Sequence, residues 1–234
     1  MRAAVLFDVD GTLVKGQGAG RQALARGIEQ VLRVPAERAF EITGRIDYRG
    51  STDRRILEQN FSLLELPRDE HERAVVDAYL AHLPESIAAS GMVLLPGAAE
   101  LLAELEDRKV RVGLLTGNVR AAARLKIEPF GLSALAERPG GFGDDGRDRE
   151  TIARIAFERL ESAGGPPEPL LIVGDTEWDV LAARAVGATA VAVETGWTSA
   201  TALADSRPDL LLPDLRAAEA LLELLDAGTA PAPP

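Results

Sequence analysis

The chain has 234 residues, a formal net charge of −11 and no cysteine. This length allows one large domain or two smaller ones, and the lack of cysteine excludes disulfides, thiol nucleophiles and thiolate metal sites. The acidic balance argues against a nucleic-acid-binding surface. No apolar stretch is long enough to span a membrane, and Asp8 comes too early for the apolar core of a signal peptide. We therefore expect a cytoplasmic protein that binds neither nucleic acid nor membrane.

The first predicted element is a buried strand from Ala3 to Asp8, which leads into Val9-Asp10-Gly11. An apolar run that ends in Asp-Gly is typical of a strand entering a turn. Because strand side chains alternate, Asp8 and Asp10 should point the same way. They would lie at the carboxyl end of the strand, where open α/β sheets bind ligands. Adjacent carboxylates repel, so a divalent cation is their simplest partner, although two solvated acids would explain this segment equally well.

A long helical block follows, with no convincing strand between residues 19 and 89. Its predicted amphipathic helices, separated by Pro35, Pro67 and Pro84, cover residues 21–33, 36–43, 53–64 and 69–83. We interpret residues 16–92 as an all-α cap domain inserted after the first strand, with glycine-rich linkers at 16–20 and 90–92.

Strands and helices alternate from about residue 95 onward. The predicted strands are 110–116, 170–174, 189–193 and 210–212, and the predicted helices begin after Pro96-Gly97 and cover 121–130, 149–160, 177–186 and 214–225. Such alternation predicts a parallel sheet. The expected fold class is α/β, a Rossmann-like three-layer core with a mostly parallel sheet over residues 1–15 and 93–227, plus the inserted cap. Residues 228–234 are expected to be disordered.

Two further strands are predicted to end in polar residues. Thr116-Gly117-Asn118 ends one strand just before a helix, so free helix N–H groups and the Thr116 hydroxyl could hold a phosphate, although Thr-Gly-Asn is also an ordinary turn. Asp175 ends another strand, and Asp179 lies in the first turn of the next helix, where an acid also serves as a cap. Four acids in one crevice would be costly without a metal ion.

In this order and spacing, these segments resemble the motifs of the haloacid dehalogenase-like hydrolase superfamily. Residues 8–12 are similar to its first motif, residues 115–118 to its second and residues 174–179 to its fourth. The helical cap, and Ala182 to Ala188 before a valine-rich strand, resemble the phosphoglycolate phosphatase-type branch. The resemblance extends from residue 1 to about residue 225 and is weakest in the cap.

The resemblance implies a role for each matching residue. Asp8 attacks phosphorus and becomes an aspartyl-phosphate, while Asp10 protonates the leaving oxygen and then activates water. Thr116, with Gly117 and Asn118, holds the phosphoryl oxygens.

The resemblance also implies a Mg²⁺ site. Its ligands would be Asp8, Asp10 through the nearby backbone carbonyl, and Asp175, with Asp179 binding directly or supporting from behind.

The third motif departs from the family pattern. Branch members usually have a lysine before a proline in the loop that precedes the fourth motif, whereas residues 138–149 contain no lysine. The cation could come from Lys126, one of only three lysines, or from Arg149 or Arg147. We expect Lys126 beside the nucleophile with Arg149 in support. A solvated helix face is the alternative for all three.

Two cap segments, residues 44–47 and 51–53, resemble the substrate-facing cap loop of this branch. Arg45 and Thr52 are therefore candidate substrate-binding residues. The alternative is a helix–helix turn in which Ser51 or Thr52 is a helix N-cap. Trp178 and Trp197 are interpreted as packing residues.

The implied function is a Mg²⁺-dependent phosphatase that hydrolyses small-molecule phosphate monoesters through an aspartyl-phosphate, similar to phosphoglycolate phosphatase. The expected partner is a small phosphorylated metabolite, and the chain is expected to be a monomer or homodimer. A dehalogenase does not need Asp10, and a phosphonate hydrolase of this family needs a cap lysine, which residues 16–91 lack. A beta-phosphoglucomutase-like sugar phosphomutase remains open.

A catalytically idle binding protein is a further alternative. Loss of Asp8 or Asp10 would indicate it, and both are present. In an active enzyme, we expect the cap to open and close over the site and to exclude water.

Overall fold

The computed structural model describes residues 2–68 and 70–228. Within these ranges, no helix combines the length and the apolar character that a membrane crossing requires. The expectation for residues 228–234 lies outside the described part of the chain, except that Gly228 is the last residue of helix α10.

A parallel five-stranded sheet forms the centre of the molecule, with strand order β4-β1-β5-β6-β7. Its strands are β1 (Ala4–Phe7), β4 (Arg111–Leu114), β5 (Leu170–Gly174), β6 (Thr189–Val193) and β7 (Leu210–Leu212). Phe7 of β1 lies opposite Leu114 on one side and Val173 on the other. Because the three strands run parallel and in register, the residues that follow them emerge together at one edge of the sheet.

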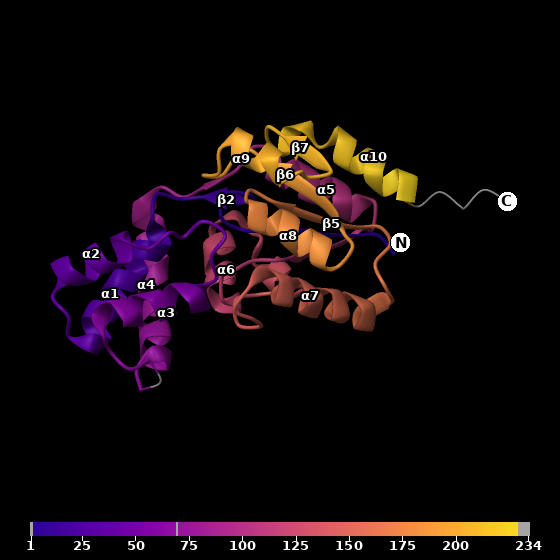
Figure 1. The fold of residues 1–234 in the computed structure, drawn as a ribbon. Helices are drawn as coiled ribbons and strands as arrows, with labels where there is room; N and C mark the ends of the chain where they lie inside the picture. The colour runs from indigo at the N-terminus through magenta and orange to yellow at the C-terminus, as the bar shows by residue number, and fades with distance from the viewer. Residues whose placement is uncertain (1, 69, 229–234) are drawn as a thin grey trace.

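Helices cover both faces of this sheet (Figure 1). One face carries α5 (Ala98–Asp107), α6 (Arg120–Ile127) and α10 (Glu219–Gly228), and the other carries α7 (Arg149–Gly164) and α8 (Glu177–Ala185). Side chains of β1 alternate between them: Val5 and Phe7 join the first layer, and Ala4 and Leu6 the second. The predicted three-layer α/β core with a parallel sheet is confirmed.

Four helices gather beyond the carboxyl edge of the sheet (Figure 1). They are α1 (Ala19–Leu32), α2 (Ala36–Gly44), α3 (Asp53–Leu64) and α4 (Glu72–Ser90), and they share an apolar core of their own. This helical cap is confirmed, and the boundaries at residues 16 and 92 remain a prediction. Two short strands that the sequence did not indicate, β2 (Val14–Lys15) and β3 (Val93–Leu94), pair antiparallel where the chain enters and leaves the cap.

Four helical segments differ from the prediction. Helix α4 continues through Pro84, because Leu83 and Ile87 on either side are buried in the cap core, and this packing outweighs one lost hydrogen bond. The predicted last helix is divided into a 3₁₀ turn, η3 (Leu215–Ala217), and α10. The short helix α9 (Ala200–Asp205) was missed. The predicted helix 121–130 is divided into α6 and a 3₁₀ turn, η1 (Glu128–Phe130), and a further 3₁₀ turn, η2 (Ser133–Glu137), follows.

The glycine-rich segment before α7 runs along the free edge of β4. The Gly141 N–H donates to the Leu114 carbonyl, and the Thr116 N–H donates back to the Gly141 carbonyl. Gly140 cannot be replaced easily, because a Cβ there would lie 2.3 Å from the Leu114 carbonyl oxygen. This segment brings the first residue of α7, Arg149, towards the carboxyl edge of the sheet.

Candidate active site

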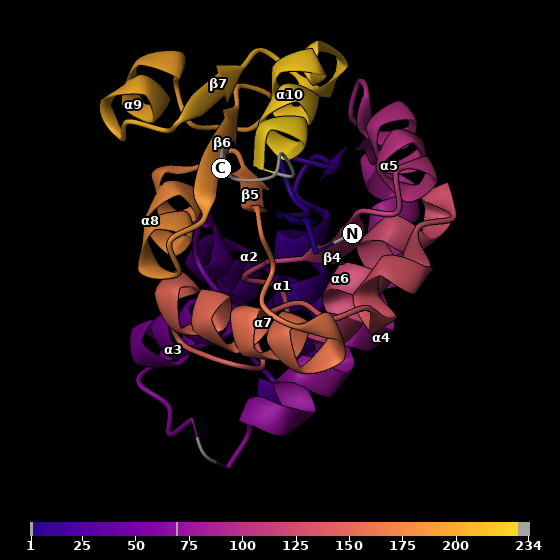
Figure 2. The same cartoon turned by 90° about the vertical axis from the view of Figure 1, so that its right-hand side faces the viewer.

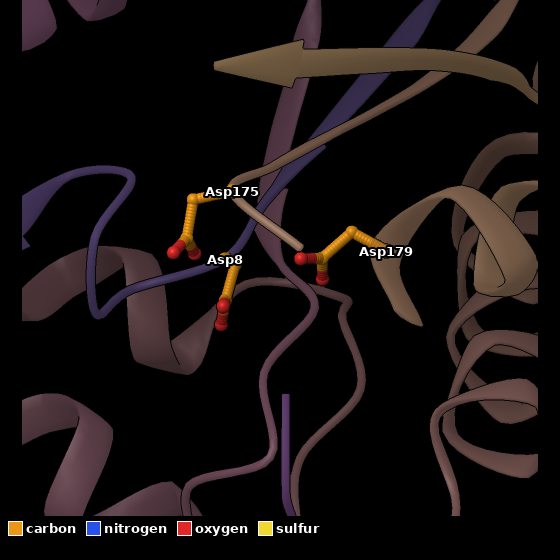
Figure 3. Close-up of side chains that lie close together, drawn as sticks. All are labelled: Asp8, Asp175 and Asp179. Carbon is orange, nitrogen blue, oxygen red and sulfur yellow. The ribbon is translucent and has the colours of Figure 1, made fainter. Parts of the chain in front are cut away.

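Three buried carboxylates meet at the carboxyl edge of the sheet (Figure 3). Asp8 follows β1, Asp175 follows β5, and Asp179 lies in the first turn of α8. Their exposed fractions are only 3%, 1% and 2%, and one oxygen of each lies within 4.8 Å of the others. Three of the four acids that were predicted to share one crevice therefore lie close together.

A single arginine offsets part of the charge of this acidic cluster. Arg149 donates through Nη2 to Asp8 Oδ2 at 2.9 Å, and its Nη1 lies 3.2 Å from Asp179 Oδ1. Nη1 also donates to the Leu115 carbonyl. Arg149 is buried, and although burial alone would lower its pKa, the charges of Asp8 and Asp179 raise it. The guanidinium is therefore a fixed positive charge facing three acids.

The acidic cluster fits a divalent cation. Burial raises the pKa of both Asp175 and Asp179, and the neighbouring carboxylates raise it further. Asp8 Oδ1 and Asp175 Oδ1 are buried and accept no hydrogen bond in the described structure. Closely spaced carboxylate oxygens without donors are suitable ligands for a hard cation.

Two glycines allow the backbone to approach Asp175. A Cβ at Gly11 would lie 2.5 Å from Asp175 Oδ2, and one at Gly196 would lie 1.6 Å from it. Gly11 was part of the first predicted motif, but Gly196 was missed. The position of Gly196 just after β6, the strand that pairs with β5, could have indicated it.

Asp10 belongs to a separate cluster with Lys126. Lys126 Nζ donates to Asp10 Oδ2 and to Asn118 Oδ1, both at 2.6 Å. Asn118 Nδ2 donates to the same Asp10 oxygen and to Thr116 Oγ1, both at 2.8 Å. The side chain of Asp10 is 30% exposed. Lys126 and Asn118 therefore fix one carboxylate oxygen while part of the side chain stays accessible.

The prediction for the two cations is therefore corrected. Arg149, rather than Lys126, contacts Asp8, because the first residue of α7 is closer to the end of β1 than the last turn of α6. Lys126 contacts Asp10 instead. The Asp10 side chain therefore lies outside the acidic cluster that was expected to include it. Burial alone would lower the pKa of Lys126, but the charges of Asp10 and Asp53 raise it. Arg147 is on the surface, paired with Glu58 of the cap.

Two backbone N–H groups at the start of α6 donate to carboxylates. The N–H of Val119 donates to Asp53 Oδ2 at 2.8 Å, and the N–H of Arg120 donates to Asp144 Oδ2. Thr116 is fully buried, with its hydroxyl next to Asn118. Two of the N–H groups that were expected to be free are therefore occupied by carboxylates, and the phosphate-holding role of Thr116, Gly117 and Asn118 stays a prediction.

The cap docks directly on the second motif. Asp53, at the start of α3, donates its N–H to the Gly117 carbonyl at 2.8 Å. A Cβ at Gly117 would lie 2.3 Å from the Ser51 carbonyl oxygen, so glycine is needed for this approach. Trp178 lies against Gly50 in the same interface, in agreement with its interpretation as a packing residue.

A cavity of about 790 Å³ lies between the cap and the acidic edge of the sheet. Asp8, Asp10, Lys126, Arg149 and Asp175 reach it from the core, and Gly117 and Asn118 also line it. Trp197 lines it as well, with Lys15 Nζ 5.0 Å from the ring centre.

Neither cap candidate lines this cavity. Arg45 is exposed at the end of α2. Thr52 is buried as the N-cap of α3, where it accepts from the Arg55 N–H and donates to the Arg147 carbonyl. Thr52 thus has the N-cap role that the sequence offered as the alternative, and substrate contact by Arg45 or Thr52 stays a prediction that the lining of this cavity does not support. Tyr48, Ser51 and Asp53 line the cavity instead, and the sequence signal for them was the same cap loop.

We predict that the two cations differ in their contribution to stability. In metal-free protein, Arg149→Met leaves buried Asp8 and Asp179 unpaired and should lower the free energy of unfolding by about 3 kcal/mol. The loss for Lys126→Met should be smaller than this by about 1 kcal/mol or more, because solvent reaches Asp10. Urea unfolding in the presence of chelator measures both values. Equal losses for the two variants would contradict the assignment of Arg149 to the buried cluster.

We also predict a pH dependence that arises from Asp53. Burial raises the pKa of Asp53 from 3.8 to about 6, against the opposing charge of Lys126. A raised carboxyl pKa stabilises the folded state at low pH, and this contribution is lost as the pH rises through about 6. The stability of the wild type relative to Asp53→Asn should therefore fall by about 1–2 kcal/mol between about pH 4 and about pH 7. Asp77→Asn on the exposed face of α4 is the matched control, and a constant wild-type-minus-Asp53→Asn difference would reject the prediction.

Comparisons with known proteins agree with this geometry. A family model described as haloacid dehalogenase-like hydrolase matches residues 3–187. Phosphoglycolate phosphatase of Rhodospirillum rubrum is 29% identical over 204 residues, which cover 85% of this chain and 82% of that protein. The probable phosphatase IndB of Dickeya dadantii is 29% identical over 234 residues, 96% of each chain.

The fold has a close counterpart among solved structures. The crystal structure of a hydrolase from Pseudomonas syringae superimposes with a TM-score of 0.70 at 21% identity and covers 97% of this chain and all of that one. With the family model matching most of the chain and the acidic cluster at the matching strand ends, the chain belongs to the haloacid dehalogenase-like hydrolase family.

Proposed function

We propose that this protein is a Mg²⁺-dependent phosphatase that hydrolyses small-molecule phosphate monoesters through an aspartyl-phosphate on Asp8, as a phosphoglycolate phosphatase-like enzyme. The observation that carries the proposal is the buried cluster of Asp8, Asp175 and Asp179 beneath a cavity that also exposes Asp10. The names of the relatives, phosphoglycolate phosphatase and probable phosphatase, support it.

In the proposed first step, an oxygen of Asp8 attacks phosphorus. The Asp8 oxygen–phosphorus bond forms as the ester oxygen–phosphorus bond breaks, and the leaving oxygen takes a proton from Asp10. In the second step, Asp10 takes a proton from water, and the water oxygen displaces Asp8 from phosphorus. Inorganic phosphate leaves, and both carboxyl groups return to their initial state.

Arg149 and Lys126 position different carboxylates. Arg149 fixes the Asp8 carboxylate through Oδ2, which leaves Oδ1 without a donor and available for attack or for a metal ion. Lys126 and Asn118 converge on one oxygen of Asp10 and orient it towards the cavity. Positioning of this kind and neutralisation of charge account for most of the catalysis of phosphoryl transfer.

Asp8 and Asp175 are the proposed Mg²⁺ ligands from side chains, with Asp179 behind them. When bound, the ion would neutralise the charge that gathers on the phosphoryl oxygens. The Asp10 side chain faces Lys126, so its proposed part in the metal site is limited to the backbone carbonyl near it. The raised pKa values of Asp175 and Asp179 imply that metal binding expels protons.

The cap would open to admit substrate and close for the reaction. The contact of Asp53 with Gly117 and Val119 holds the closed arrangement, and closure limits the access of water to the phosphorylated Asp8. A small phosphorylated metabolite is the proposed partner. A cytoplasmic location and a monomeric or homodimeric state remain predictions.

Phosphate release by the purified protein tests this proposal. A panel of small phosphate esters should release phosphate with Mg²⁺, with at least a ~10³-fold loss of kcat in Asp8→Asn and a comparable loss with chelator. Asp209→Asn, at an exposed ion pair with Arg184, is the matched control and should keep full activity.

The alternatives give different results in the same assay. A sugar phosphomutase would release little phosphate, yet a phosphorylated Asp8 could be trapped from a sugar bisphosphate. An idle binding protein would show neither phosphate release nor phosphorylation.

A further inference from the structure

The cavity is much larger than a two-carbon leaving group requires. A water molecule occupies about 30 Å³ of liquid volume, and the cavity measures about 790 Å³. A phosphate with a two-carbon acid would fill only a small part of it and would leave the rest to water. Sites for small molecules usually bury most of their ligand, so the size of the cavity indicates a bulkier leaving group.

The walls contributed by the cap are mostly apolar. Leu24 of α1, Ile56 and Leu57 of α3 and Val76 of α4 line the cavity. They form a surface suited to an apolar or aromatic body.

An acid lies on the wall nearest the second motif. Asp53 accepts from the Val119 N–H and, beside Asp10, adds a negative group next to the proposed phosphate position. Lys126 offsets part of this charge, and a leaving group with its own carboxylate close to the phosphate would face the remaining repulsion.

Arg21 of α1 is a cation with no partner of its own. It lines the cavity, and its Nε is buried without a hydrogen-bond partner. Its guanidinium lies 4.6 Å from the ring centre of Phe40, and stacking of this kind leaves the N–H edge free to donate. In the described residues, 2–68 and 70–228, no acid forms an ion pair with it.

Two hydroxyl groups that line the same cavity also lack a hydrogen-bond partner among the described residues. Tyr48 Oη and Ser51 Oγ are also buried without a partner, and both residues line the same cavity. Burial raises the pKa of Tyr48 by more than the charge of Arg21 lowers it, so the phenol stays a neutral donor close to the guanidinium. Buried donors without partners are rare in proteins and point to a missing acceptor.

We propose that the substrate is a phosphate monoester with a bulky, largely apolar leaving group that carries an acceptor oxygen, a carboxylate or a carbonyl, bound by Arg21 with Tyr48 and Ser51. This inference rests on the proposed phosphatase activity and sets its substrate class. Arg21 selects the substrate at a distance from the reacting phosphate. Phosphoglycolate, which is short and carries its carboxylate next to the phosphate, would be a poor substrate.

Four esters test the proposal: phenyl phosphate, 4-carboxyphenyl phosphate, 4-acetylphenyl phosphate and phosphoglycolate. Each is assayed with Mg²⁺ against wild type, Arg21→Met and Tyr48→Phe. The variant-to-wild-type ratio for one ester cancels intrinsic differences in leaving ability. Arg26→Met, one turn and a half further along α1 and outside the cavity, is the matched control.

Arg21→Met should lower kcat/KM about 30-fold for the ester that carries the recognised oxygen, mainly through KM, and by no more than about threefold for phenyl phosphate. A loss confined to 4-carboxyphenyl phosphate identifies a carboxylate, and a loss that includes 4-acetylphenyl phosphate identifies a carbonyl. Tyr48→Phe should show a smaller loss for the same ester, and Arg26→Met should show none.

Two results would overturn the proposal. One is a wild-type preference for phosphoglycolate over the aryl esters, and the other is an equal loss for all esters in Arg21→Met, which would show a merely structural role. Failure of the proposed phosphatase activity itself looks different, because wild type would then hydrolyse none of the four esters with Mg²⁺.

Discussion

The burial of three carboxylates against one guanidinium is the constraint on which the rest of the site depends. Asp8, Asp175 and Asp179 are nearly inaccessible, and Arg149 is the cation that touches two of them. Such an arrangement is costly in a folded protein without further positive charge. It persists because β1, β5 and the first turn of α8 fix the acids by backbone geometry, whereas the loop along β4 fixes Arg149. A divalent cation would remove the remaining imbalance.

Separation of the acids into two clusters gives each a distinct environment. Asp8 is almost fully buried beside Arg149, while Asp10, two residues later, is partly exposed and is held by Lys126 and Asn118, and both line the cavity. The alternation of side chains along a strand did not bring the two carboxylates together, because the chain turns after Val9 and closes a tight loop at Gly11, which has a φ of +81°. In the proposed mechanism, the first carboxylate attacks phosphorus and the second transfers the proton.

The sequence predicted the core well, because its signals are local and repeated. Apolar runs that end in polar residues identified β1, β4 and β5 and hence the edge where Asp8 and Asp175 meet. The prediction that Lys126 is the cation beside Asp8 was wrong. The distances from Asp8 to Arg149 and to Lys126 depend on how α6 and α7 pack, and the spacing of residues along the sequence does not encode this packing. The roles of the cap residues depend on packing in the same way. Thr52 had a local role as an N-cap, and the unpaired Arg21 only becomes noticeable when the helix partners around it are known.

The central claim is that the buried acidic cluster binds a divalent cation next to a nucleophilic Asp8. A crystal structure of the protein with Mg²⁺ and beryllium trifluoride, a mimic of the aspartyl-phosphate, tests it most directly. The account predicts the mimic bonded to an oxygen of Asp8, with Mg²⁺ coordinated by Asp8 and Asp175. An unmodified Asp8, with the metal ion bound elsewhere or with Arg149 alone filling the cluster, would contradict it.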